Sequence, residues 1–222
     1  MPSRHTHREP DLFTRGPVER HLDTLKALRT AAETCQRCPL YKNATQTVLG
    51  EGQAHAPVVF VGEQPGDQED LQGKPFVGPA GKMFDRALAE AGINRKRVYV
   101  TNAVKHFKFE PRGKRRLHKK PNAYEIERCN WWLDHELKVI EPQLAVALGA
   151  TAARALFGKV ITISRVRGDF LTLPEHGEVE GYVTVHPSSL LRAPDEESRA
   201  REYARFVSDM RAIARHVPQI RA

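Results

Sequence analysis

Four short apolar segments, separated by amphipathic stretches, limit this chain to a layered fold of strands and helices. Residues 58–61 form a continuously apolar run that ends at Gly62, which is typical of a strand buried on both faces of a parallel sheet. Three further strands are predicted at 97–101, 144–148 and 182–185. The pattern predicts an α/β fold, a single domain with a central, mostly parallel four-stranded sheet flanked by helices. A ligand would bind beyond the carboxyl ends of its strands.

Helices are predicted where apolar residues recur at intervals of three and four positions. They occupy about 22–35, 83–91, 122–140, 151–157 and 196–216. The third of these begins with Asn122 and has Glu125 three residues later, a pair that favours a capping box.

The length of 222 residues suits one domain. Residues 1–17 are polar and predict a flexible N-terminal arm, and 18–222 form the domain. No repeat or long heptad pattern indicates assembly, so we expect a monomer. No apolar run reaches the roughly 18 to 20 residues that span a bilayer, and the first residues do not resemble a signal peptide. We therefore expect a cytoplasmic protein with no membrane partner.

The positive charge of the chain is concentrated in one segment. The formal net charge is +8, and residues 105–120 hold eight Lys and Arg against one Glu. Such a run, with Gly113 as a hinge, is suited to follow a phosphate backbone. His118 lies within it, and the positive surroundings favour its neutral, nucleophilic form. The alternative is a solvated basic loop with an incidental histidine.

Polar side chains follow the first predicted strand directly. Glu63, Gln64 and Asp67 offer two carboxylates and an amide on a tight turn, where a small molecule could meet them. The Gly-rich and Pro-rich segment 73–81 contains Phe76, which either stacks on a planar ligand or fills the core. An ordinary polar turn is the alternative to a binding site here.

Asn102 and His186 occupy the same kind of position after two other strands. Asn102 has both a donor and an acceptor, as reading the amide edge of a base requires. His186 could donate a hydrogen bond to a developing oxyanion. Taken alone, each is more often a turn former or a structural histidine, so neither fixes a function by itself.

Three cysteines cannot form a closed set of disulfides and instead point to metal binding. Cys35 and Cys38 have the spacing of metal ligands, Cys129 is a third thiol, and His106 is a candidate fourth ligand. The spacing suits zinc and an iron–sulfur cluster equally. Buried thiols without a metal are the alternative.

Five motifs, in this order, resemble those of the uracil-DNA glycosylase superfamily. They are GEQPGDQED, GKPFVGPAG, TNAVKHFKF, KRRLH and HPSSLLR. Within the superfamily the chain is similar to the iron–sulfur family 4 enzymes and, more closely, to the UdgX branch, which carries the KRRLH insertion. The resemblance covers about residues 20–215.

The resemblance implies a role in uracil excision for each motif residue. Phe76 would stack on uracil, Asn102 would hydrogen-bond its polar edge, and His186 would stabilise the charge on O2 of the leaving anion. Residues expected to act at the glycosidic bond are Glu63, Gln64 and Asp67. Residues expected to bind substrate besides Phe76 and Asn102 are Gly62, Arg116 and Ser188.

The resemblance to the UdgX branch also implies a cofactor and a covalent step. A [4Fe-4S] cluster would be bound by Cys35, Cys38, His106 and Cys129. In this set His106 stands where family 4 has a cysteine. His118 would attack C1′ of the abasic sugar, with a carboxylate such as Glu63 on its other ring nitrogen.

Three functions are open at this point. The first is a single-turnover uracil-DNA glycosylase that becomes trapped on uracil-containing DNA through His118, with single strands favoured because base flipping costs least there. The second is a turnover glycosylase that releases free uracil and leaves an abasic site. The third is a non-catalytic iron–sulfur protein that binds nucleic acid. His118 separates the first from the second, and Glu63, Asn102 and His186 together argue against the third.

Overall fold

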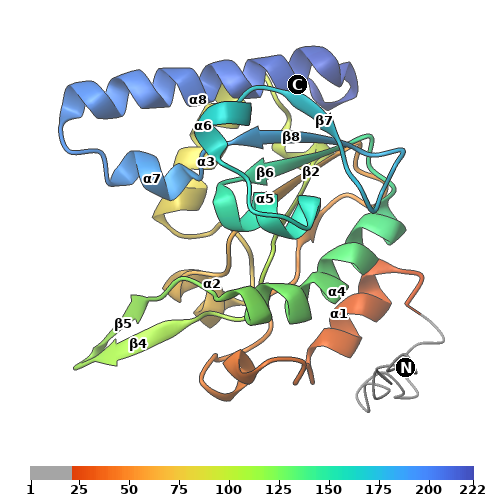
Figure 1. Cartoon of the computed structure of the whole chain (residues 1–222), viewed down its shortest axis with the longest axis vertical. Helices are drawn as coiled ribbons and strands as arrows, with labels where there is room; N and C mark the ends of the chain where they lie inside the picture. The colour runs from red at the N-terminus through yellow and green to blue at the C-terminus, as the bar shows by residue number, and fades with distance from the viewer. Residues whose placement is uncertain (1–21) are drawn as a thin grey trace, which may run out of the picture.

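A sheet forms the middle layer of the structure, which is a computed structural model that describes residues 22–222 (Figure 1). Its strands are β1 (Glu51–Gly52), β2 (Val58–Gly62), β3 (Tyr99–Asn102), β6 (Leu144–Leu148), β7 (Phe170–Thr172) and β8 (Glu180–Thr184). They lie in the order β1-β3-β2-β6-β8-β7, and the four inner strands are parallel. The predicted parallel sheet is therefore confirmed, with an antiparallel strand added at each edge. Both added strands are short and lie mostly outside the core, so they leave no apolar pattern in the sequence.

Helices cover both faces of this sheet (Figure 1). They are α1 (Leu25–Ala32), α2 (Asp67–Gln72), α3 (Pro79–Glu90), α4 (Ala123–Ile140), α5 (Ala150–Phe157), α6 (Ile163–Val166), α7 (Pro187–Leu191) and α8 (Glu196–His216). Short 3-10 helices lie at Pro39–Lys42, Arg95–Arg97 and Pro218–Ile220. The predicted helices are found, although the first begins only after its cap at Thr24; the predicted arm at 1–17 lies outside the described residues. Within residues 22–222, none of the helices combines the length and apolar character that crossing a membrane requires.

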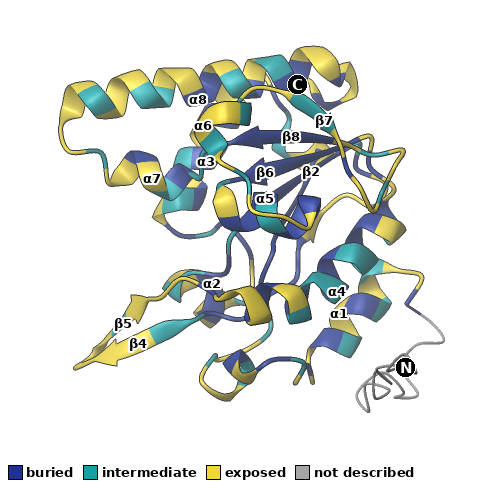
Figure 2. Cartoon of the chain, viewed as in Figure 1, coloured by how far each residue is buried: buried dark blue, intermediate teal, exposed yellow. Residues whose placement is uncertain are grey.

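Alternate residues of a buried strand face opposite layers, so β2 contributes to two hydrophobic cores. Val59 and Val61 pack in a core with α1, α4 and α5. Val58 and Phe60 pack in a second core with α3 and α8. All four side chains are fully buried, and Figure 2 shows the inner strands as a dark layer between helices that are exposed on their outer sides. The layered fold thus follows from the two-residue period of a strand.

The basic segment is a β-hairpin, where the sequence analysis predicts a loop. β4 (Phe109–Arg112) pairs antiparallel with β5 (Arg115–His118), and Gly113, with a φ of +59°, begins the two-residue turn between them. The ends of the hairpin meet, since the Lys119 amide donates to the Lys108 carbonyl at 2.9 Å. In Figure 1 the hairpin projects from the body of the molecule beside α2. Its strands are mostly exposed, β4 contains a proline and β5 is cationic, so neither strand shows an apolar pattern.

A fully buried ion pair between Lys105 and Glu136 joins the end of β3 to α4. The Lys105 ammonium donates to Glu136 Oε2 at 2.6 Å. It also donates to Thr101 Oγ1 at 2.7 Å and to the Asn102 carbonyl at 2.6 Å. Glu136 accepts three further hydrogen bonds, from the Tyr99 and Thr101 hydroxyls and from the Gly50 amide, each at 2.8 Å. Because both charges are removed from water, each depends on this set of partners.

Replacing Lys105 by Met is expected to lower the free energy of unfolding by about 3 to 5 kcal/mol, because the Glu136 carboxylate is left buried without its cation. The double variant K105M/E136Q is expected to be more stable than K105M by about 1 kcal/mol or more, since a neutral amide at this position still accepts from Tyr99. Urea unfolding of the three chains measures both differences. A double variant that is less stable than K105M would contradict this explanation.

Candidate active site

The ends of β2 and β3 form the floor of the candidate site. Gly62 and Asn102 are partners in the parallel register, so they lie side by side at the carboxyl edge of the sheet. A Cβ atom on Gly62 would come within 2.3 Å of Asn102 Oδ1 and 2.8 Å of the Phe76 ring, and only glycine leaves room for both. The structure therefore brings together the amide and the ring that the sequence analysis selects.

The Phe76 ring is fixed by a strained loop. Phe76 has a φ of +58°, a left-handed conformation that costs a residue with a Cβ atom about 1 to 2 kcal/mol. Gly81 permits this turn, since a Cβ atom there would lie 1.8 Å from the Phe76 carbonyl oxygen. Glu69 ties the loop to the turn before α2 by accepting from the amides of Gly66 at 3.1 Å and Gly78 at 2.8 Å. The ring is thus in place before any ligand arrives.

His186 is the N-cap of α7, and its ring centroid lies 6.3 Å from that of Phe76. Its Nδ1 accepts from the Ser188 amide at 3.2 Å and is 2.8 Å from the Ser188 hydroxyl. Burial is the main cause that lowers the pKa of His186 to about 4, and the neighbouring Arg192 and His118 act in the same direction. A neutral ring whose Nδ1 accepts has its hydrogen on Nε2, which is free to donate. Ser188 orients this ring, and its predicted role in binding substrate stays a prediction.

Glu63 stands between two side chains from distant parts of the sequence. Its Oε1 is 3.4 Å from His118 Nε2, at the end of β5. Its Oε2 accepts a hydrogen bond from the Thr151 hydroxyl, in the first turn of α5, at 2.5 Å. The His118 side chain is 49% exposed and that of Glu63 is 23% exposed, so a ligand can reach both. The structure thus places a carboxylate beside the candidate nucleophile.

Gln64 holds the two ends of the hairpin together. Its Nε2 donates to the carbonyls of Lys108 and Lys119, both at 3.1 Å, and its Oε1 accepts from the Lys108 amide at 3.2 Å. The sequence analysis predicts a catalytic role for Gln64. In the structure its buried side chain bonds to backbone groups at both ends of the hairpin and so positions it, while the catalytic role stays a prediction.

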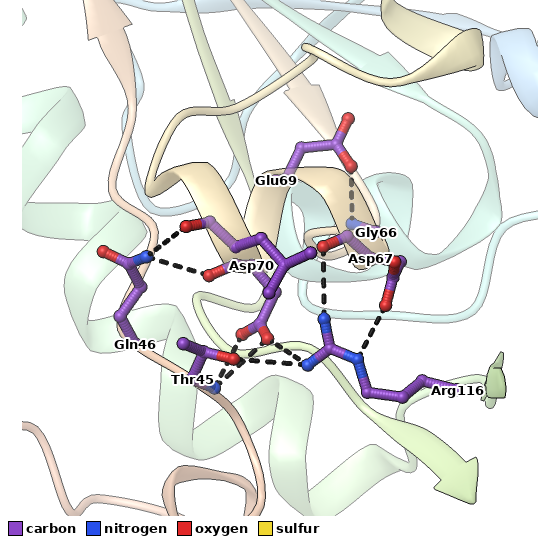
Figure 3. A network of polar contacts seen from close by, with 8 residues as sticks. Thr45, Gln46, Gly66, Asp67, Glu69, Asp70 and Arg116 are labelled. Carbon is purple, nitrogen blue, oxygen red and sulfur yellow. Dashed lines mark hydrogen bonds and ion pairs between the residues drawn. The ribbon is translucent and has the colours of Figure 1, made fainter. Parts of the chain in front are cut away.

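Arg116 fastens β5 to α2 (Figure 3). Its Nε donates to Asp67 Oδ1 and its Nη1 to Asp70 Oδ2, each at 2.6 Å. Asp70 is fully buried and also accepts from the Thr45 amide at 3.0 Å. These bonds make Arg116 and Asp67 anchors of the strand that ends at His118, and their predicted roles toward the substrate stay predictions.

Only part of the charge of the basic segment is free for a partner. Four of its eight cations pair with carboxylates, namely Lys105, Lys108, Arg116 and Lys119. In the part of the chain that the structure describes, no ion pair involves the other four, which are Arg112, Lys114, Arg115 and Lys120. These exposed residues lie at the tip of the hairpin and just after its base, where they can meet phosphates.

The three cysteines lie buried in the core that contains α1 and α4. Burial is the main cause that raises the pKa of the Cys129 thiol to about 12, and the neighbouring Cys38 and Cys35 act in the same direction. The Lys105 amide donates to Cys129 Sγ and the Trp132 indole to Cys35 Sγ, both at 3.1 Å. Among residues 22–222, no group of three or more His, Cys, Asp or Glu side chains is placed to hold a metal ion.

His106 presents a buried lone pair and directly follows Lys105, whose amide donates to Cys129 Sγ. Its Nε2 is 2.9 Å from Thr47 Oγ1, and the Thr47 hydroxyl donates to the Ala32 carbonyl at 2.7 Å, so Nε2 is the donor of the pair. Burial lowers the pKa of His106 to about 4, so the ring is neutral. Its Nδ1 therefore carries a lone pair, and no described residue bonds to it. Three thiols with such a nitrogen form a donor set that fits a metal group.

Three positioning residues are absent from the sequence-based predictions. Thr151 follows β6 almost directly. A polar residue at such a position after a strand is the signal that selects Asn102, so the same signal could have found Thr151. Glu69 and Asp70 give no such signal, because the groups they bind, the Gly78 amide and the Arg116 guanidinium, are brought to them only by folding.

His186 is expected to stay neutral, with its hydrogen on Nε2, from pH 8 down to about pH 5, because burial lowers its pKa to about 4. Nitrogen-detected NMR of the imidazole measures this directly. As the pH falls from the ordinary histidine pKa toward 4, the unfolded chain takes up this proton before the folded one does, so His186 destabilises the fold over that range. A titration midpoint near 6.5 for His186 would contradict the assignment of its Nε2 as a fixed donor.

A model of the Uracil DNA glycosylase superfamily matches residues 49–211. The type-4 uracil-DNA glycosylase of Archaeoglobus fulgidus is 38% identical over 166 residues, which cover 72% of this chain and 80% of the relative. The type-4 enzyme of Thermotoga maritima is 38% identical over 178 residues, covering 80% and 88%. That of Sulfurisphaera tokodaii is 33% identical over 180 residues, covering 78% and 79%. With the fold and the strand-end site described above, these matches show that the chain belongs to the uracil-DNA glycosylase superfamily.

Proposed function

We propose that this protein excises uracil from DNA and then stays attached to the abasic sugar through His118, the reaction of the UdgX branch. The observation that carries the proposal is the His118 ring, 3.4 Å from the Glu63 carboxylate. The hairpin that presents it is anchored by Gln64 and Arg116. A nucleophile is thereby held next to the side chains that would bind and release the base.

Excision would begin with uracil held by Asn102 and Phe76. The amide hydrogen-bonds the polar edge of the base, and the ring stacks on its plane. The N1–C1′ bond then breaks and leaves its electron pair on uracil. His186 donates its Nε2 hydrogen bond to O2, where the negative charge collects. The uracil anion takes a proton from water and leaves as free uracil.

The broken bond leaves a positively charged C1′. The lone pair of the His118 nitrogen that does not face Glu63, which is Nδ1 as the ring is placed, forms the new bond to this carbon. The positive charge then resides on the imidazole ring, whose Nε2–H faces the Glu63 carboxylate. The carboxylate balances that charge and so stabilises the adduct.

A turnover glycosylase is the second candidate, because the relatives at 38% identity are named type-4 uracil-DNA glycosylases. In that reaction Glu63 would hold a water molecule in place of the His118 ring. The water oxygen would bond to C1′ and give an abasic site. Both candidates use Asn102, Phe76 and His186 in the same way, so only the fate of the sugar separates them.

A denaturing gel tests the proposal with end-labelled single-stranded DNA that contains one uracil. The wild-type protein is expected to give a slow, heat-stable band, and His118→Ala is expected to lose it because the nucleophile is gone. Free DNA that alkali cleaves at the uracil position would instead support turnover. Unchanged DNA would leave only the non-catalytic binder.

His55→Asn is the matched control for this experiment. His55 is exposed and lies before β2, at the opposite end of that strand from Gly62. Its φ of +58° is one that asparagine tolerates. The control is expected to form the adduct with wild-type yield, and loss of the band in both variants would contradict the assignment of the nucleophile to His118.

We also propose that a [4Fe-4S] cluster is bound by Cys35, Cys38, His106 and Cys129. Support comes from the buried sulfurs, the N–H groups that two of them accept from, and the unpartnered Nδ1 of His106. When bound, the cluster would link the segment after α1, the loop after β3 and helix α4 through its metal–ligand bonds, and take no part in bond cleavage.

Purified protein is expected to show the broad visible absorbance of iron–sulfur proteins and about four iron atoms per chain. His106→Ala is expected to lower the iron content, because it removes one ligand, whereas His55→Asn retains it. Iron analysis and the visible spectrum measure both. Zinc in place of iron would overturn the cluster assignment.

A further inference from the structure

Thr151 lies where the two reactive parts of the site meet. It follows β6 and Gly149, whose φ of +91° begins α5. A Cβ atom on Gly149 would be 3.1 Å from the Cβ of His186, so this turn packs directly against the residue that would receive the uracil charge. From the same turn, the Thr151 hydroxyl reaches Glu63 Oε2 at 2.5 Å.

The hydroxyl of Thr151 has one hydrogen, and it donates that hydrogen in a bond to the Glu63 carboxylate. Thr151 is 3% exposed, so water does not compete for this bond. The distance of 2.5 Å lies in the range of hydrogen bonds between a hydroxyl and a charged oxygen. Such bonds are about twice as strong as those between neutral groups. Thr151 thus fixes the Oε2 atom of the carboxylate.

Fixing one oxygen of a carboxylate also sets the direction of the other. With Oε2 held by Thr151, Oε1 of Glu63 faces Nε2 of His118 across 3.4 Å. Glu63 is partly exposed, so without the hydroxyl its carboxylate could turn toward solvent and hold water instead of the ring. The arrangement therefore favours attack by His118 over attack by water.

We infer that Thr151 is a positioning residue for the covalent step, which it controls by holding Glu63 against His118. The inference rests on the proposed function and deepens it, because it names what divides the excised sugar between the protein adduct and the free abasic site. The Thr151 hydroxyl is engaged with Glu63, so binding of uracil through Asn102 and Phe76 should not depend on it.

Three substitutions test this role. Thr151→Val keeps the shape of the side chain and removes the hydroxyl, whereas Thr151→Ser keeps the hydroxyl and removes a methyl group. Thr172→Val is the matched control, since Thr172 is an exposed residue of the edge strand β7. Single-turnover reactions on end-labelled single-stranded DNA with one uracil give the rate of excision, the adduct yield and the yield of alkali-labile sites.

Thr151→Val is expected to lower the ratio of adduct to alkali-labile sites about tenfold, as loss of a hydrogen bond to a charged group implies. Thr151→Ser is expected to restore the ratio to within about twofold, and Thr172→Val to leave it unchanged. Inhibition by free uracil should be the same in all four proteins, because the Asn102 and Phe76 groups are intact. A merely structural defect would weaken that inhibition.

An unchanged ratio in Thr151→Val would overturn the inference, as would a defect that Thr151→Ser does not repair. A wild-type chain that releases uracil without forming an adduct would overturn the covalent step of the proposed function and this inference with it, because Thr151 would then have no such step to control. A wild-type chain that leaves the DNA unchanged would overturn the proposed function and the inference together.

Discussion

One buried carboxylate, Glu136, holds together the parts of the molecule on which the site depends. It receives the Lys105 ammonium and two hydroxyls of β3, and it lies two helical turns from Cys129 on α4. Lys105 in turn holds the carbonyl of Asn102. Because a buried charge cannot lose its partners without a large cost, the end of β3 and helix α4 are kept in one arrangement. Asn102 and the helix that carries Cys129 thereby belong to one rigid unit.

A second set of polar contacts holds the hairpin that carries His118. The amide of Gln64 and the guanidinium of Arg116 hold the hairpin at its base and along β5, and both act on groups of the hairpin or of α2. Half of the cations of the basic segment are used within the protein. The net charge counted along this segment therefore exceeds the charge that is free to meet phosphates.

Much of the fold was predictable because it depends on local pattern. The continuous apolar run at 58–61 predicts a buried parallel strand, and Asn122 with Glu125 predicts the start of α4; both are found. The hairpin was not predicted, because its strands are mostly exposed and show no apolar pattern. Asn102 and His186 were selected by the rule that polar residues after strands line a site. It could not assign roles to Gln64, Arg116 and Ser188, because residue type does not reveal which partner folding will supply.

The meeting of the hairpin's two ends has an evolutionary consequence. Chain enters at Lys108 and leaves at Lys119, and these residues share a backbone hydrogen bond of 2.9 Å. A segment with adjacent ends can be inserted or deleted as a module without moving the strand and the helix on either side. Under the proposed function, a repair enzyme that releases its product could thus become a one-use DNA tag through a single insertion, with the ancestral base-reading apparatus left as it was.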